Sequence, residues 1–354
     1  MDNKPRPEPR SRAPKAHVKA LSQASLNIPT VRNRSTSPSP AKARSSSISI
    51  PLTQKAYKDY SSSPAASFLS RFAIDDDWQK HMPLKEGDAL RDYVIGPLIS
   101  RGTFSECRKA YSSLHHQDVA AKVINSCKSE GNTELKHHLA FWRQLDHPNI
   151  LKLLEVVEVN SQLVAITLLA DKSLLQRVNE NPLSESQARY YFKQLLAAVT
   201  YLHNKGFAHG DIKLENILLS DDKLLLADFD MCHALTDCQS KGSLLYLPPE
   251  VLSGADGTMN AEANPESACC LEGKKDIWAM GVVLYAMIIG KMPFCLHQHS
   301  FSSHSIISEI KAQSHFTDFS PELSDLLSKM LKPNPQERTS LSEISNHHWF
   351  TSSN

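Results

Sequence analysis

The sequence predicts an α+β fold in which a small, strand-rich part precedes a larger, helix-rich part. Three short runs, 91–99, 106–113 and 118–125, have the length of strands and are separated by turn residues. From residue 184 onward, apolar residues recur every three or four positions, which is the period of an α-helix. Two parts of this kind predict two lobes with a cleft between them, the usual place for a ligand site.

The other elements have local signals of their own. Residues 131–145 have helical spacing, and a short polar turn between the β-rich runs 153–159 and 163–169 predicts a hairpin. Ser184 begins a capping box that opens a long helix, and Ser320 precedes a proline at the first position of a later one. A mostly helical region is therefore expected to follow the hairpin.

Charge and composition set the first 64 residues apart. The chain of 354 residues has a net charge of +1, but residues 1–60 hold 12 Lys or Arg against 3 Asp or Glu. Residues 1–64 are also rich in Ser and Pro and poor in aromatics, which predicts disorder. A regulatory linker is favoured over a nucleic-acid or membrane contact, because the basic residues are spaced out without aromatics between them. Residues 65–90 are expected to pack on the domain or to bind something outside it.

Several classes of protein are disfavoured. The N-terminus lacks the apolar region of a secretory signal, and the longest apolar run, 277–290, is shorter than the roughly 20 residues of a membrane span. This run is expected to be a buried core helix. The seven cysteines form no CxxC pair, so a reducing compartment, the cytoplasm or the nucleus or both, is expected. The 16 histidines lack the spacing of a helical metal site.

The strongest chemical signal is a set of short motifs in a fixed order. HGDIKLEN contains Asp211, then Lys213 two residues later and Asn216 five residues later. An Asp-Phe-Asp triplet follows at 228–230. The later motifs are PPE, DIWAMG and P-x-x-R, which contain Glu250, Asp276 and Arg338. One such motif would be a weak signal, whereas five in order leave little room for chance.

On these motifs the chain resembles the eukaryotic protein kinase family over residues 91–350, most nearly its calcium/calmodulin-kinase-like serine/threonine branch. The resemblance implies a bilobal kinase-like fold, with a β-rich N-lobe at 91–168 and an α-helical C-lobe at 169–350. It also implies transfer of the γ-phosphate of ATP to Ser or Thr of protein substrates, with ATP and Mg²⁺ as the groups bound.

Roles for individual residues come from the same resemblance. Asp211 would accept the proton of the substrate hydroxyl, and Lys213 would steady the transferring phosphate. Asn216 and Asp228 would hold Mg²⁺, which prefers oxygen ligands. Lys122, in the run VAAKVI, matches the strand-borne lysine that grips the ATP phosphates.

Two further groups of residues are implied. The first would form the ATP pocket and hinge: Leu98, Gly102, Ala120, Thr167, Leu169 and Leu218. The second is structural, with Asp276 anchoring the backbone of the catalytic loop and Arg338 pairing with Glu250. A buried charge needs such a partner, so these three residues matter for the fold rather than for the chemistry.

The nucleotide-binding half departs from the family pattern in two places. The glycine-rich loop keeps only Gly102 of three glycines, which should weaken its approach to phosphate. The helix expected at 131–145 should supply a glutamate to Lys122, but His138 stands at that position. Glu134 lies one turn earlier on the same face. Either Glu134 reaches Lys122, or the ion pair is absent.

Three departures lie in the second half. Gly210 replaces the arginine that usually pairs with a phosphorylated activation loop, and Asp230 replaces the glycine of D-F-G. Asp230 adds a carboxylate near the expected Mg²⁺. Residues 253–274 are about ten longer than usual, polar and punctuated by Gly and Pro, which predicts a surface loop. This segment is interpreted as a tolerated insertion, and the less favoured alternative is a binding site for a partner protein.

Two functions remain open at this point. An active protein serine/threonine kinase is favoured, because Lys122, Asp211, Lys213, Asn216 and Asp228 are all present. The alternative is a pseudokinase, a scaffold or nucleotide-binding regulatory module with weak or no catalysis, which the departures motivate. Protein substrates are the expected partners, and regulatory proteins would bind through the basic tail or the 253–274 segment. Nothing in the sequence indicates an oligomeric state.

Overall fold

The computed structural model describes residues 84–101, 105–124, 131–159, 162–235, 242–255, 265–294 and 319–351. All of these belong to one compact unit, 54–354. The tail at 1–64 and most of the expected extension, up to residue 83, lie outside the described residues.

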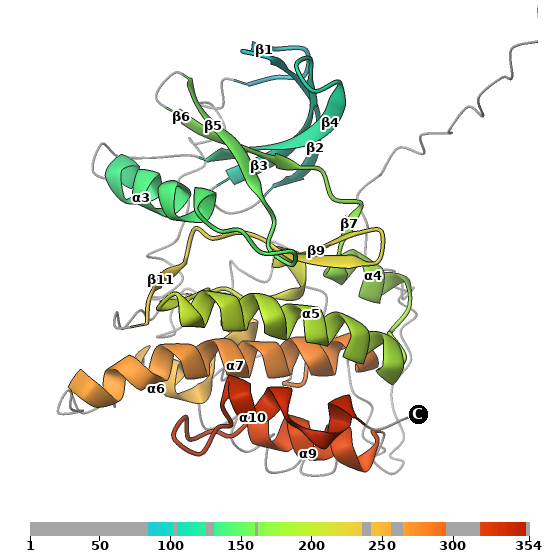
Figure 1. Cartoon of the computed structure of the whole chain (residues 1–354), viewed down its shortest axis with the longest axis vertical. Helices are drawn as coiled ribbons and strands as arrows, with labels where there is room; N and C mark the ends of the chain where they lie inside the picture. The colour runs from blue at the N-terminus through green and yellow to red at the C-terminus, as the bar shows by residue number, and fades with distance from the viewer. Residues whose placement is uncertain are drawn as a thin grey trace, which may run out of the picture. The chain divides into compact units, whose positions relative to one another are not determined.

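The strand-rich part is an antiparallel sheet in the order β1-β2-β3-β4-β6-β5 (Figure 1). Its strands are β1 (Ala89–Leu90), β2 (Tyr93–Arg101), β3 (Ser105–Ser112), β4 (Gln117–Ile124), β5 (Leu153–Val159) and β6 (Gln162–Leu168). The three predicted strands and the predicted hairpin are confirmed, with boundaries shifted by one or two residues. In the hairpin Val159 pairs with Gln162.

β4 places Lys122 by simple alternation. Val119, Ala121 and Val123 are fully buried in a core cluster that includes Val164 of β6. Because successive side chains of a strand point to opposite faces, Lys122 projects from the face that this core does not use.

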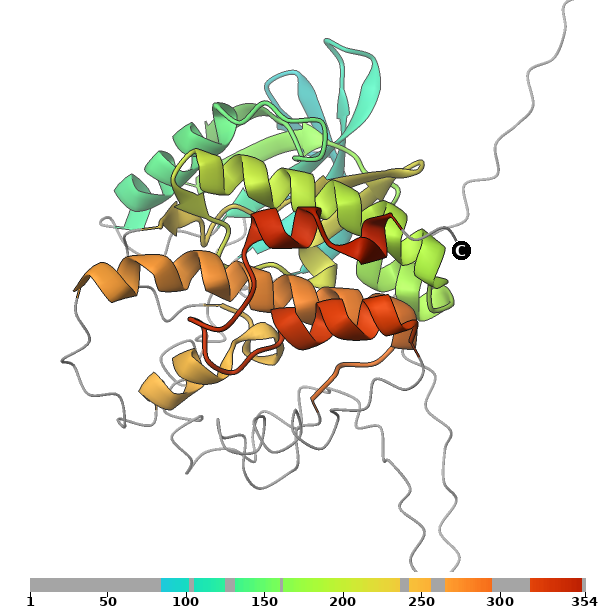
Figure 2. The same ribbon diagram turned by 60° about the horizontal axis from the view of Figure 1, so that its bottom comes forward.

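The helical part is organised around two long helices, α5 (Glu185–Asn204) and α7 (Pro265–Ile289), which pack against each other. Figure 2 shows α9 alongside α7 near the end of the chain. The other helices are α3 (Gly131–Arg143), α4 (Leu174–Glu180), α6 (Pro249–Ala255), α9 (Pro321–Met330) and α10 (Leu341–Ser345), with 3-10 turns at Leu214–Asn216, Leu244–Tyr246 and His348–Phe350.

The predicted helix starts are confirmed. The Ser184 hydroxyl accepts the backbone N–H of Gln187, whose side chain accepts the Ser184 N–H, so the capping box is complete. Ser320 caps α9 in the same manner through the N–H of Leu323. The apolar run expected to form a core helix lies in α7, where most of 276–287 is buried. No helix among the described residues is both long and apolar enough to cross a membrane.

The expectation of a surface loop over 253–274 is wrong for most of its described part. Residues 253–255 close α6, and α7 begins at Pro265. Proline is well tolerated at the first turn of a helix, where its missing N–H has no intrahelical partner. The Gly and Pro residues that suggested a loop therefore mark a helix start as well. Residues 256–264 lie outside the described ranges.

Two small sheets hold the loops that carry the motifs. One contains β7 (Lys172–Ser173), β9 (Ile217–Ser220) and β10 (Lys223–Leu226), and the other pairs β8 (Phe207–Ala208) with β11 (His233–Ala234). The loop 209–216 runs from β8 to β9, and the loop 227–232 runs from β10 to β11. The paired strands β8 and β11 lie at one end of both loops, and the paired strands β9 and β10 lie at the other end. The two loops are therefore held side by side.

Candidate active site

The loop 209–216 is held in place by the carboxylate of Asp276, a residue of α7. The backbone N–H groups of His209 and Gly210 donate to Asp276 Oδ2 and Oδ1 at 2.8 and 3.0 Å. The His203 ring at the end of α5 contacts Asp276 Oδ2 through Nε2 at 2.8 Å. The structure thus places Asp276 where a backbone anchor was expected.

The Asp276 carboxylate is held in its charged form. Asp276 is only 2% exposed, and burial alone would raise the pKa of its carboxyl group. The hydrogen bond and charge of His203, together with His209, outweigh burial and lower the pKa of Asp276 to about 2.

This shift makes a prediction for acid stability. Since the pKa of Asp276 falls from 3.8 to about 2 on folding, its ionised form stabilises the protein fully above about pH 4. This contribution, about 2 kcal/mol, should be lost as the pH falls toward 2. Urea unfolding of the native chain and of Asp276→Asn should give a stability difference that shrinks between pH 4 and 2. A difference that stays constant over this range would contradict the assignment.

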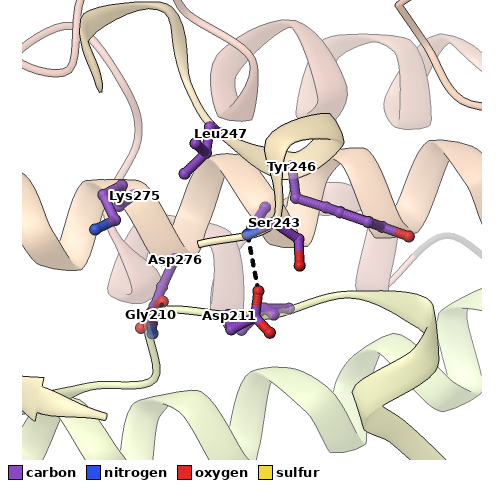
Figure 3. Close-up of a pocket in the computed structure, with 9 residues that line it drawn as sticks. Gly210, Asp211, Ser243, Tyr246, Leu247, Lys275 and Asp276 are labelled. Atoms are coloured by element: carbon purple, nitrogen blue, oxygen red, sulfur yellow. Dashed lines mark hydrogen bonds between the residues drawn. The ribbon is translucent and has the colours of Figure 1, made fainter. Parts of the chain in front are cut away.

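Asp211 lies at the centre of a hydrogen-bonded group. Lys213 Nζ donates to Asp211 Oδ2 at 2.6 Å, and the Ser243 N–H donates to Asp211 Oδ1 at 2.9 Å (Figure 3). Asn216 Nδ2 donates to the carbonyl and to Oδ2 of Asp211 at 2.9 and 3.0 Å. The Ser243 hydroxyl accepts from Lys213 Nζ at 2.9 Å. The Asp211 carboxylate is therefore oriented by three residues. Lys213 and Asn216 are close to it in sequence, and Ser243 is 32 residues away.

Asp211 also lines a pocket. Its walls come from the loop 209–216, the 3-10 turn before α6 and the middle of α7 (Figure 3): Gly210, Asp211, Ile212, Ser243, Tyr246, Leu247, Lys275, Asp276 and Ala279. The Tyr246 hydroxyl donates to Glu215 at 3.2 Å and accepts the Leu214 N–H at 3.3 Å, which ties the turn to the loop. A carboxylate oriented in this way can accept a proton from a hydroxyl group placed beside it.

Lys275 is a pocket residue that the sequence reasoning missed. It is only 5% exposed although it carries an ammonium group. The only available signal was its position directly before Asp276, which gives no direction for its side chain. Its inclusion in the pocket comes from the way α7 passes beneath the loop.

Gly210 is required by the backbone at this point. Its φ is +80°, and a Cβ there would lie 2.7 Å from the carbonyl oxygen of Met231 and 3.0 Å from the His233 ring. The arginine that the family pattern has at this position would be strained in this conformation. The departure at Gly210 is therefore tied to close contact with the loop before β11.

Gly210→Ala should destabilise the fold for two reasons: backbone strain at the positive φ, and close contact of the new Cβ with the Met231 carbonyl. Gly206, with φ of +82° and nothing within 4 Å of its virtual Cβ, provides a matched control. Gly206→Ala should cost about 1–2 kcal/mol from the positive φ alone. Gly210→Ala should cost at least about 1 kcal/mol more, because the Met231 carbonyl has to move. Denaturant unfolding of both variants measures the difference, and equal losses would show that the contact is unimportant.

Lys122 reaches the second loop. Its Nζ donates to Asp228 Oδ1 and to Asp230 Oδ2, both at 2.6 Å. Burial would lower the pKa of Lys122, but the two carboxylates raise it above its usual value. Burial would raise the pKa of Asp228, but Lys122 lowers it to about 2. The pKa of Asp230 is raised, by burial and by the Asp228 charge, against the opposing effect of Lys122.

Two possible partners of Lys122, Glu134 and His138, were expected from α3, and the structure pairs Lys122 with residues of the loop 227–232 instead of His138. Among the described residues, the ion-pair partners of Lys122 are Asp228 and Asp230, and His138 is not one of them. The side chain of Glu134 lies outside the described residues. Counting residues back from the HPNI motif pointed to α3, whereas the carboxylate that replaces the D-F-G glycine makes the contact.

The donors available for Mg²⁺ fit that ion. The Asn216 contacts to Asp211 use its amide nitrogen, which leaves the amide oxygen outside them, and Lys122 contacts one oxygen of Asp228. The Ala227 N–H bonds the Asn216 carbonyl at 2.9 Å, which holds the two loops together at this point. No cluster of three or more His, Cys, Asp or Glu suited to a metal occurs in the described ranges. Mg²⁺ bound with substrate phosphates needs only one or two protein carboxylates.

The remaining predicted ATP-site residues come from β2, β4, the segment after β6 and β9. Ala120 of β4 is paired with Thr167 of β6, and both are buried. Leu218 of β9 is paired with Ser173 of β7. Leu98 of β2 is 43% exposed, and Leu169, which directly follows β6, is half-buried. Gly102 lies outside the described residues.

The two residues expected to pair for structural reasons are in contact. The Arg338 guanidinium donates to both Glu250 oxygens, NH1 to Oε1 at 2.9 Å and NH2 to Oε2 at 3.0 Å. It also lies over the Trp278 ring, 5.0 Å from the centroid. The Arg338 side chain is fully buried. This pair joins α6 to the segment before α10.

Several known proteins are similar to this chain in sequence. A carbon catabolite-derepressing protein kinase of Candida glabrata is 32% identical over 276 residues, which cover 75% of this chain and 43% of that protein. The CBL-interacting serine/threonine-protein kinase 2 of Arabidopsis thaliana is 33% identical, covering 73% of this chain and 56% of the relative. The testis-specific serine/threonine-protein kinase 3 of Mus musculus is 33% identical and is covered over 96% of its length.

The match therefore spans about half of the fungal and plant relatives and nearly all of the mouse one. A family model described as protein kinase domain matches residues 93–350. This range contains the sheet from β2 onward, the two motif loops and the helices that hold them. The chain belongs to the protein kinase family.

Proposed function

We propose that the chain is a protein serine/threonine kinase of the calcium/calmodulin-kinase-like branch, which transfers the γ-phosphate of ATP to Ser or Thr of protein substrates. The observation that carries the proposal is the orientation of Asp211 by Lys213, Asn216 and Ser243 at the edge of a pocket. Catalysis of phosphoryl transfer is mainly positioning and electrostatic stabilisation, so preorganised groups are what the reaction needs.

Each residue of the group has one task in this proposal. Asp211 accepts the proton of the incoming substrate hydroxyl. The hydrogen bonds from its neighbours orient its carboxylate for this transfer. Lys213, beside Asp211, stabilises negative charge on the phosphoryl group as it is transferred. Asn216 and Asp228 hold Mg²⁺, which when bound neutralises phosphate charge. Lys122 orients the ATP phosphates.

A second candidate function has its own supporting observation. Lys122 contacts two carboxylates of the same loop rather than His138 of α3, which differs from the arrangement the family pattern implies. A chain with this arrangement and a glycine-poor phosphate loop could be a pseudokinase, binding nucleotide as a scaffold or regulatory module. In a pseudokinase, the hydrogen bonds around Asp211 would stabilise the fold of the loop and would not serve phosphoryl transfer.

Partners and compartment are proposals of the same kind. Protein substrates would meet the pocket beside Asp211. One relative is named as a CBL-interacting kinase, and regulatory proteins would bind this chain through its basic tail or the 253–274 segment. Action in the cytoplasm, the nucleus or both is consistent with the cysteine usage.

The deciding experiment is phosphoryl transfer by the purified full chain. ATP labelled at the γ-phosphate, Mg²⁺ and peptide libraries with Ser, Thr or Tyr acceptors are incubated with the native chain and with Asp211→Asn. Label on Ser and Thr peptides with the native chain alone supports the kinase. Nucleotide binding without transfer supports the pseudokinase. Strong label on Tyr, or equal label with Asp211→Asn, would overturn the proposed activity.

A further inference from the structure

The ammonium group of Lys122 lies between two carboxylates that come from one triplet. Asp228 and Asp230 each accept from Lys122 Nζ at 2.6 Å, and the side chains are 34%, 26% and 14% exposed, respectively. Charge-assisted hydrogen bonds of this length are the strong ones. Lys122 therefore has a partner beyond the carboxylate to which the family pattern assigns the metal.

The backbone places Asp230 in this position through the residue before it. Phe229 is 1% exposed and packs against Trp142 of α3 and His209 of the catalytic loop, with ring centroids 5.4 and 5.2 Å apart. The Cys232 N–H closes a turn onto the Phe229 carbonyl at 3.1 Å. With its neighbour held from two sides, the Asp230 carboxylate is directed to Lys122 by the fold.

The second partner matters because Asp228 has another task in the proposed function. A lysine bound to Asp228 alone would lose its partner whenever that carboxylate is recruited by a divalent cation. Asp230 can retain Lys122 when this happens, because its contact uses a separate carboxylate. At the α3 position where the family pattern has a glutamate for this task, the chain has His138, which is not among the ion-pair partners of Lys122.

We propose that Asp230 is the positioning residue for Lys122, in place of a carboxylate from α3, so that the loop 228–230 alone sets the direction of this lysine toward nucleotide phosphates. This inference rests on the proposed function of the site. In consequence, nucleotide binding depends on the Asp-Phe-Asp triplet and is insensitive to side-chain changes at Glu134 and His138 of α3.

A double-mutant cycle on nucleotide binding tests the inference. The full chain, Asp230→Asn, Lys122→Ala and the double variant are titrated with a fluorescent ATP analogue in the presence of Mg²⁺. Asp230→Asn should weaken binding about tenfold, as expected for loss of a charged partner, with an unchanged thermal midpoint. In the Lys122→Ala background the same change should have no further effect. Asp230→Glu should restore part of the affinity.

The α3 variants Glu134→Gln and His138→Ala are the controls and should bind like the native chain. Native-like binding by Asp230→Asn, or a tenfold loss with Glu134→Gln, would overturn the inference. An equal loss on Asp230→Asn with and without Lys122 would do the same, since Asp230 would then act independently. Binding without phosphoryl transfer by the native chain would sink only the proposed activity. No binding by the native chain would overturn both.

Discussion

Replacing Asp211 with asparagine is expected to lower phosphoryl transfer by about 10²–10⁴-fold, the usual contribution of a general base. Asparagine has nearly the same shape but offers one acceptor oxygen where the carboxylate offers two, so it keeps the contact with either Lys213 or the Ser243 N–H. It cannot take up the proton of a substrate hydroxyl. The loss should therefore appear in kcat, with nucleotide affinity and thermal stability close to those of the native chain.

The measurement is initial rate of transfer to a Ser peptide, alongside nucleotide titration. Asp222→Asn is a matched control, because Asp222 is exposed in the β9–β10 turn and the substitution is chemically identical. It should leave the rate unchanged. A native-like rate for Asp211→Asn would rule out a base role for this carboxylate. A loss of affinity as large as the loss of rate would indicate that the site had rearranged.

The structure of the loop 209–216 could be predicted because its signals are local in the sequence. Asp211, Lys213 and Asn216 lie within six residues, so their types and spacing carry most of the information about their contacts. Helix caps are local for the same reason, and Ser184 behaves as its sequence predicts. The roles of the loop residues in chemistry stay predictions until rates are measured.

The sequence indicated contacts between distant segments only through the family resemblance, as for Glu250 and Arg338, and it missed others. Lys122 meets Asp230 across 108 residues, and this partner depends on how Phe229 packs between α3 and the catalytic loop. Lys275 is another example, since only the passage of α7 beneath the loop brings it to the pocket. Strands of two residues, such as β8 and β11, are too short to show any period. Yet their pairing aligns the two motif loops.

Glu250→Gln is expected to produce the largest loss of stability. The Arg338 side chain is fully buried, and both of its terminal nitrogens donate to Glu250. Glutamine keeps the shape of the side chain but removes the charge, so the guanidinium loses its counter-ion inside the protein. Removing one partner of a buried pair costs about 3–5 kcal/mol.

Other contacts of Arg338 limit the damage but cannot replace the charge. The carbonyls of Lys274 and Lys332 accept from Arg338 NH1 and NH2 at 2.7 and 3.0 Å, so its hydrogen bonds are largely kept in the variant. The uncompensated positive charge remains. The helix α6 should loosen from the segment before α10, because this pair is what links them. A Tm decrease of roughly 2–4 °C for each kcal/mol is expected.

Glu180→Gln isolates the effect of burial. It is the same substitution in an exposed pair, where Lys172 Nζ contacts the two Glu180 oxygens at 2.8 and 3.0 Å. Because water solvates both partners, this variant should lose less than about 1 kcal/mol. Chemical unfolding of the two variants and the native chain gives the comparison. Similar losses for the two substitutions would mean that the Glu250–Arg338 pair does not stabilise the fold as a buried charge pair should.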